Sequence, residues 1–469
     1  AARGKKRITR EFNETRPKVK AVVNHIRSNR PTAKIRGTEQ GDVDTAEAMN
    51  GLWMNVWNNS NGDNITDFAA ETQVAAGMGA WFVDTEYCED SVSDQDIFIR
   101  AIRNPLCLIP DRAAKEQDKS DARHWNYATS MSKSAYEAKY GKADKVASFD
   151  PGELNAENDP NTDEETIWLT AYWRKEPYTK TLYLLATGET VDDLTKLAGP
   201  VTVVKQRDIR AHKIVQYIMS ATEILERNEW AGKHFPFVVA YGEYVVINGK
   251  TRWSGLTQTM MDAQRAHNET LTGVYETIAM SPQSKYWMTA VQGKGLMGQV
   301  QAAIDENLPV MLYNHDKDAP GPPERVGGAD VPAALIQAAQ MSRDSMKSVS
   351  GIFDASLGET SNETSGKAIR ARTDQALVVT YNFSDNIAKA IGRTCEIVLD
   401  LIPKVIDTQR AYRILGKDGA EKYITVNKRD PVSGEIIEND LSKGKYDFVV
   451  TQGPNLQTQR QEAVEELRD

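Results

Sequence analysis

The stretch SGLTQTMMDAQRAHNETLTGVYETIAMSP, residues 254–282, predicts one unusually long helix. About 26 residues at a rise of 1.5 Å each span about 39 Å before Pro282 ends the helix. His267 lies on its seam, where a single histidine is more often packed than a metal ligand. The seam residues recur at steps of three and four, which places them on one helix face: Leu256, Met260, Ala263, His267, Leu271, Val274 and Ile278.

Two further long helices are predicted downstream. The stretch DVPAALIQAAQMSRDSMKSVSG has Asp330 as the expected N-cap and Pro332 in the first turn, and it ends at Gly351. A longer helix is expected over 365–402, with Pro403 at its end. Helices of this length suit a subunit that packs side by side with copies of itself.

The remaining chain predicts a mixture of helices and sheets, so the expected fold class is α+β. Asn248-Gly249 is a strong hairpin signal within a β-rich region. Helices are expected in an amphipathic opening segment that ends at 29–31, at 44–57 and at 65–77. Strands are expected at TAKI (32–35), within 80–110 and 167–253, and at RIL (413–415), KYITV (422–426) and YDFVV (446–450).

Composition narrows the class of protein. The chain has 469 residues, a formal net charge of −9 and three scattered cysteines, Cys88, Cys107 and Cys395. This pattern argues against a disulfide framework and for assembly in a reducing compartment. No apolar run approaches the roughly 18 residues of a membrane span. The negative charge is a poor match for a protein that grips DNA by neutralising phosphates.

Two glycine-rich stretches invite a nucleotide-binding interpretation. LGETSNETSGKAIRAR (357–372) resembles a P-loop, but seven residues separate Gly358 from Gly366 where four are needed, and Ala368 stands where a Ser or Thr would reach Mg²⁺. GKGLMG (293–298) is a literal G-x-G-x-x-G, with Asp316 at about the spacing of a ribose-binding acid. GKGLMG lies in one short insert between long helices, without the βαβ units of a dinucleotide fold. A glycine-rich turn is therefore favoured over a cofactor site.

No catalytic constellation is found. The six histidines lie in six unrelated contexts, and no H-E-x-x-H, G-x-S-x-G or CxxC motif occurs. The sequence therefore predicts no enzyme, no catalytic or metal-binding residues and no cofactor, although catalytic partners can be distant in a chain.

The order of the parts resembles the portal proteins of short-tailed double-stranded DNA bacteriophages. The resembling stretches are SNRPTAKI, GMGAWFVDTEY, IPDRAAKEQDKSDARHW, HFPFVVAYGE, SGKAIRAR and YDFVVTQGPNLQTQRQEA, which run in order from residue 28 to residue 463. The resemblance implies a ring, usually of twelve subunits, at one capsid vertex. Such a ring conducts double-stranded DNA during packaging and ejection. It binds the terminase large subunit and head-to-tail adaptor proteins, and it also contacts the major capsid and scaffolding proteins.

The resemblance also implies that the protein assembles in the host cytoplasm and is part of the virion, with no membrane involved. It further implies a division of the chain into parts. The parts would be a mixed α/β wing (1–253), stem helix 1 (254–281), a small α/β clip (282–329), stem helix 2 (330–350), a tunnel loop (351–364), a long wing helix (365–402), a second β-rich part of the wing (403–453) and the start of a helical crown or barrel (454–469). The alternatives are a nucleotide-dependent enzyme that uses GKGLMG and another ring-forming virion adaptor.

The tunnel loop and the collar beside it are the candidate DNA-facing site. Gly, Ser, Thr and Asn dominate the loop, so few apolar groups could anchor it to a core. The candidate residues have mixed charge, which suits a wall along which DNA slides; Glu363 and Lys367 could equally pair within the helix at i,i+4. The candidates are Glu359, Asn362, Glu363, Thr364, Lys367 and Arg370.

Overall fold

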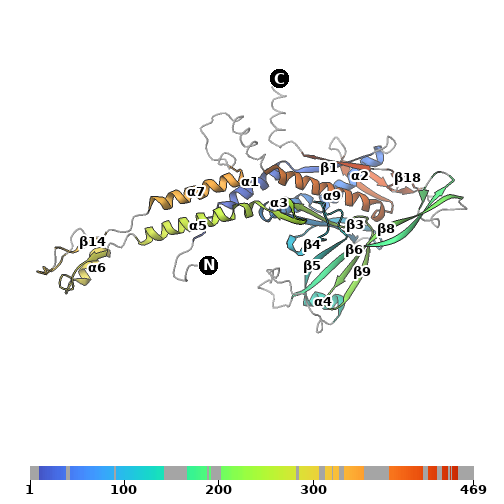
Figure 1. Ribbon diagram of the computed structural model, residues 1–469. Helices are drawn as coiled ribbons and strands as arrows, with labels where there is room; N and C mark the ends of the chain where they lie inside the picture. Colours follow the sequence, from blue (N-terminus) through green and yellow to red (C-terminus); the bar gives the residue numbers. More distant parts are fainter. Residues whose placement is uncertain are drawn as a thin grey trace, which may run out of the picture. The chain divides into compact units, whose positions relative to one another are not determined.

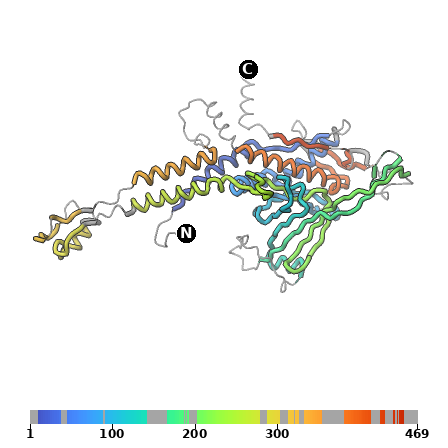
Figure 2. The backbone as a smooth tube through the Cα atoms, in the orientation of Figure 1, coloured from blue at the N-terminus to red at the C-terminus, as the bar shows by residue number. Residues whose placement is uncertain are grey.

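The computed structural model divides the chain into two compact units (Figures 1 and 2). The first unit comprises Ala1–Ala21 and Thr257–Val379, and the second comprises Val22–Leu256 and Thr380–Asp469. The residues described are 10–37, 43–88, 91–141, 166–186, 188, 190–191, 202–280, 285–305, 312–318, 321–326, 332–352, 380–415, 421–429, 436–441, 444 and 446–452.

The second unit is organised around helix α9, Tyr381–Val405. Its apolar face is buried along its whole length, and it includes Phe383, Ile391 and Leu401. The helix packs against a three-stranded antiparallel sheet in the order β10-β2-β3. The bounds of that sheet are β2 Met78–Tyr87, β3 Gln95–Ala101 and β10 Phe237–Tyr241.

Two helices complete this layer, α2 (Val43–Asn59) and α3 (Gly62–Ala76). Gly79 on β2 is a close-approach position, because a Cβ there would lie 2.1 Å from the Ala69 carbonyl oxygen of α3. Glycine therefore lets α3 lie directly on the sheet.

Strands far apart in sequence pair in this unit. β1 (Pro31–Gly37) is antiparallel to β19 (Tyr446–Gln452), with Ile35 opposite Phe448. Trp53 of α2 donates its indole N–H to the Ala33 carbonyl at 3.0 Å, which fixes β1 on the helix. The early and late parts of the unit are thus one folded body.

A second sheet has the order β4-β5-β6-β8-β9, with the short β7 paired to β6. Two of its tryptophans, Trp125 and Trp173, are buried in a core that also contains Phe237 of the first sheet. The bounds are β4 Leu108–Pro110, β5 His124–Ser132, β6 Thr166–Leu185, β7 Thr190–Val191, β8 Val203–Met219 and β9 Ile224–Trp230, followed on β5 by helix α4 Lys133–Tyr140.

β6 and β8 continue beyond their neighbours as a two-stranded ribbon. β5 pairs with β6 only up to Arg174, and β9 pairs with β8 only from Ile214 onward. Residues 175–185 and 203–213, which pair with one another, are called the ribbon below.

The remaining described strands form small antiparallel pairs. β11 and β12 form the hairpin that Asn248-Gly249 predicts, and these two residues have φ of 52° and 71°, the left-handed values of a tight hairpin turn. The bounds are β11 Glu243–Ile247, β12 Lys250–Ser254, β15 Arg410–Leu415, β16 Glu421–Val426, β17 Lys428–Arg429 and β18 Ile436–Glu438.

The first unit is built on two long helices, α5 (Leu256–Met280) and α7 (Ala333–Ser350), which lie side by side (Figure 1). His267 of α5 is buried, and its Nδ1 lies 3.2 Å from the Ala339 carbonyl of α7. The prediction of a packed histidine is confirmed. Between the helices in sequence are β13 Lys285–Trp287, α6 Met297–Asp305 and β14 Glu324–Val326.

The segment before helix α1 (Thr15–Ser28) is held along α5. Gln264 and Asn268, one helical turn apart, bond the backbone of Phe12 from both sides: Gln264 donates to its carbonyl at 2.5 Å, and the Asn268 side-chain oxygen accepts from its N–H at 3.0 Å. The Phe12 ring stacks on Tyr275 with centroids 5.6 Å apart. The side-chain amides of Gln264 and Asn268 thus form the backbone hydrogen bonds that a neighbouring strand would otherwise form.

Two expected helix boundaries are corrected, and a third lies outside the described residues. α7 begins at Ala333 with Pro332 as N-cap, so the cap is not Asp330, which lies outside the described residues. Pro403 lies inside α9, which continues to Val405, so the hydrogen bond that this proline removes does not end the helix. The expected helix over 365–402 is described only from Tyr381.

Candidate functional site

The six predicted tunnel residues, Glu359, Asn362, Glu363, Thr364, Lys367 and Arg370, lie outside the described residues. Their role therefore stays a prediction. Helix α9, which follows this segment in sequence, carries the most extensive hollow that we describe in the second unit.

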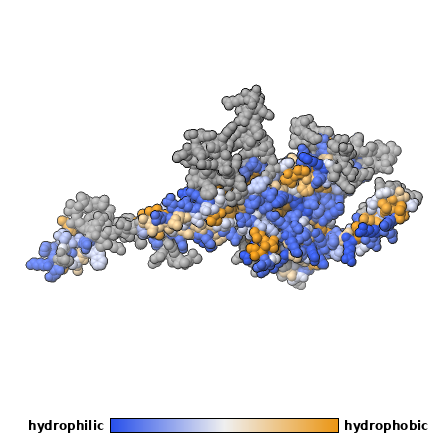
Figure 3. All heavy atoms as spheres, turned by 45° about the horizontal axis from the view of Figure 1, so that its top comes forward, coloured by the Kyte–Doolittle hydropathy of each residue, from blue (hydrophilic) through white to orange (hydrophobic). Residues whose placement is uncertain are grey.

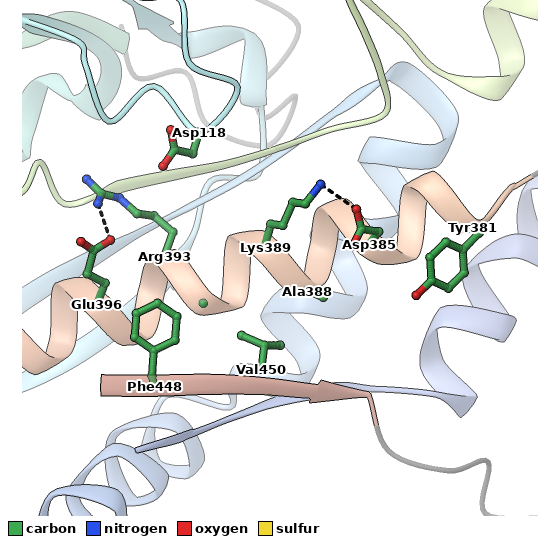
Figure 4. Close-up of a pocket in the computed structure, with 10 residues that line it drawn as sticks. Asp118, Tyr381, Asp385, Ala388, Lys389, Arg393, Glu396, Phe448 and Val450 are labelled. Atoms are coloured by element: carbon green, nitrogen blue, oxygen red, sulfur yellow. Dashed lines mark hydrogen bonds and ion pairs between the residues drawn. The ribbon is translucent and has the colours of Figure 1, made fainter. Parts of the chain in front are cut away.

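This hollow is a groove of about 620 Å³ along α9, bordered by the loop at Asp118 and by β19 (Figure 4). Its lining is half apolar and half charged. The lining residues are Asp118, Tyr381, Asp385, Ala388, Lys389, Gly392, Arg393, Glu396, Phe448 and Val450.

The floor of the groove is set by one glycine. A Cβ at Gly392 would lie 3.0 Å from both the Phe448 ring and a Val450 methyl group. The absence of a side chain on α9 therefore allows β19 to lie close against the helix, with Ala388 beside it.

The rim of the groove consists of ion pairs within α9. Lys389 Nζ lies 2.7 Å from Asp385, and Arg393 lies 2.5 Å from Glu396. The Arg393 side chain is only 10% exposed, and its charge is paired with that of Glu396. The groove therefore presents paired charges around an apolar base, an arrangement that fits protein contact better than phosphate binding.

At one end the rim meets His234 from the loop after β9. Its Nε2 lies 3.6 Å from a Glu396 carboxylate oxygen. Burial lowers the pKa of His234, and the Arg393 guanidinium lowers it further, while Glu396 and Asp400 oppose the shift. His234 is therefore mostly neutral at pH 7, and this contact becomes an ion pair only in acid.

The sequence contains one local signal for this groove. Charged residues at 385, 389, 393 and 396 follow helical spacing, and Gly392 lies among them in the helix. What the sequence does not show is that β19, about fifty residues later, would provide the opposite wall.

GKGLMG does not form the turn of a dinucleotide-binding unit. The segment forms consecutive turns with Gly295 at φ 77°, followed by α6. The neighbouring strands β13 and β14 are antiparallel, whereas a dinucleotide fold requires parallel ones. Asp316 accepts hydrogen bonds from the Thr289 hydroxyl and the Asp318 N–H.

Among the residues described, no cluster of three or more His, Cys, Asp or Glu side chains is placed to hold a metal ion. None of the helices in the described ranges is long and apolar enough to cross a membrane.

Both long helices of the first unit expose apolar side chains. On α5 these include Tyr275 and Ile278, and on α7 they include Ile336 and Met341, which is 72% exposed. Figure 3 shows hydrophobic spheres interleaved with hydrophilic ones over this region. The predicted seam of α5 is only partly covered, since Ile278 stays exposed.

These helices and sheets define an α+β protein. A family model for phage P22-like portal proteins matches residues 1–469. A curated relative, the portal protein of Acyrthosiphon pisum secondary endosymbiont phage 1, is 24% identical over 500 aligned residues, which cover 97% of this chain and 67% of that protein. The chain belongs to the P22-like portal protein family.

Proposed function

We propose that this portal protein assembles into a closed ring, of twelve subunits, at one vertex of a phage capsid. The ring conducts double-stranded DNA during packaging and ejection, and it docks the terminase large subunit and head-to-tail adaptor proteins, with major capsid and scaffolding proteins around it. The family match over the whole chain is the observation that carries this proposal. The exposed apolar side chains on α5 and α7 support it, because copies packed side by side would cover them.

Each part of the ring is assigned to a range of residues. In this proposal residues 1–253 and 403–453 form the wing, 254–281 and 330–350 the stem, 282–329 the clip, 351–364 the tunnel loop, 365–402 the long wing helix and 454–469 the start of the crown. A net charge of −9 per chain suits a conduit, because a wall that pairs tightly with phosphates would hold the DNA in place.

Native mass spectrometry of the purified chain tests the proposal. We expect one closed oligomer near twelve copies, and electron micrographs should show a ring with an axial hole. Ile336→Glu combined with Met341→Glu places two charges on the exposed face of α7, and it should abolish the ring while leaving the subunit folded.

Ser345→Glu, at an exposed polar position of the same helix, is the matched control and should assemble normally. A chain that stays monomeric at micromolar concentration at every salt concentration would contradict the proposal.

A further inference from the structure

The ribbon of β6 and β8 extends beyond the sheet to which its strands belong. Over residues 175–182 and 203–213 each strand pairs with the other on one side, and no described strand pairs with its outer edge. A two-stranded ribbon alone is marginally stable in water. An extension of this length therefore gains stability if another surface covers it.

The ribbon carries unpaired positive charge. Lys205, Arg207 and Arg210 are exposed, and none of the three has an ion pair among the described residues. Side chains alternate between faces along a strand, so Lys205 and Arg207 share one face and Arg210 lies on the other. Leu182 lies opposite Arg207, and the exposed Tyr178 is on the same face further along β6. Blue and orange spheres are interleaved over the ribbon in Figure 3.

Charged residues on an edge strand can also serve only to prevent aggregation. In that case the sign of the charge is unimportant, because glutamate blocks edge pairing as lysine does. A partner that recognises the ribbon by charge requires positive side chains. This difference separates the two explanations experimentally.

The chain itself contains a segment of complementary charge. Residues 150–165 hold seven carboxylates and no basic residue. Five of them, Asp159, Asp163, Glu157, Glu164 and Glu165, lie within nine residues of Thr166, or about 31 Å of fully extended chain. Arg207 pairs opposite Leu182, sixteen residues beyond Thr166, or about 53 Å along the strand. These five carboxylates therefore cannot reach Arg207 of their own chain.

We propose that the Lys205–Arg207 face of the ribbon binds the acidic segment 150–165 of a second copy of this chain. This inference rests on the proposed ring, because only an assembly brings copies together, and it identifies one of the contacts between them. The interleaved apolar side chains favour a polypeptide over a nucleic acid as the occupant, since a phosphate backbone offers no apolar surface.

The first experiment is zero-length carbodiimide cross-linking of rings reassembled from equal amounts of ¹⁴N- and ¹⁵N-labelled protein. Mixed-isotope peptides should join Lys205 or Lys180 to carboxylates of 150–165. Links found only within one isotope, or no such links in intact wild-type rings, would overturn this inference and leave the ring proposal standing. A wild-type chain that forms no ring would overturn both.

The second experiment reverses charge. Lys205→Glu with Arg207→Glu should weaken subunit association by about tenfold at low salt, because two attractions become repulsions. Adding Asp163→Lys, Glu164→Lys and Glu165→Lys should restore association. Arg210→Glu, an equal change of charge per residue on the other face, is the control and should have much less effect.

An unchanged association constant for the double reversal would show that the cations only protect the edge. If the double reversal instead weakens binding of linear double-stranded DNA while leaving association intact, the face contacts nucleic acid and the proposal is wrong.

Discussion

Trp81 and Thr394 are joined by a hydrogen bond at the centre of the second unit: the indole N–H donates to the threonine hydroxyl at 2.8 Å, and both residues are fully buried. The same hydroxyl donates to the Ala390 carbonyl at 2.9 Å. One small side chain thus links β2 to α9 across 313 residues of sequence.

Replacing Thr394 with valine should destabilise the unit by about 1–3 kcal/mol, because the indole N–H is left without a partner in a buried site. Thr394→Ser keeps the hydroxyl and should recover the part of this loss that is due to the hydrogen bond. Urea unfolding followed by tryptophan fluorescence measures both. Equal stabilities for the two variants would show that this bond contributes nothing.

Gly392→Ala should destabilise the second unit, although alanine normally favours a helix by about 1 kcal/mol over glycine. The new methyl group would press on Phe448 and Val450. Val450→Ala should relieve part of the strain, which a double-mutant cycle would detect.

Gly273→Ala on α5 is the matched control for this substitution. A Cβ there meets nothing within 4 Å, so the change should be neutral or stabilising. If both substitutions stabilise by the same amount, the contact between α9 and β19 is looser than the structure shows.

His234 should make the protein less stable in acid. Its pKa is lowered by burial and by Arg393, so the unfolded chain binds a proton more readily than the folded one. The stability that comes from neutral His234 is therefore complete above the unfolded pKa of about 6.5, and it is lost as the pH falls from there through the lower pKa of the folded state.

His234→Gln should make the decline in melting temperature between about pH 7 and pH 5 shallower. His212→Gln, at an exposed position on β8, controls for the loss of a histidine. A steeper decline in the His234 variant would show that protonation favours the folded state through Glu396 instead.

The predicted tunnel loop should act on DNA and not on assembly. Deleting Ser361–Thr364, or changing Lys367 to glutamate, should leave ring yield unchanged and alter the genome content per particle. Lys34→Glu, at an exposed position on β1, is the control for charge reversal. Loss of rings before any packaging step would show that the loop is structural.

Local patterns predict the elements of this chain well. The three-and-four spacing identifies α5, and Asn248-Gly249 identifies the hairpin, because both signals depend on neighbours in sequence. The α+β class is likewise confirmed. The N-cap at Asp330 is less well predicted, since the start of a helix after a small insert depends on packing more than on propensity.

The candidate sites depend on distant contacts, which a single sequence does not reveal. The α9 groove needs Phe448 opposite Gly392, and the bond between Trp81 and Thr394 leaves no periodic signal. The predicted tunnel residues stay untested, because Glu359 to Arg370 lie outside the described residues.

The pairing of β1 with β19 has a consequence for how the chain is made. Ile35 pairs with Phe448, which the ribosome adds 413 residues later. At about 5–20 residues per second this interval lasts roughly 20–80 s. During that time β1 is without its partner strand, and the β19-facing side of α9 is uncovered once α9 has been made. A nascent chain therefore cannot complete this body until synthesis has passed residue 452, which keeps shortened chains from presenting a finished subunit to a growing assembly.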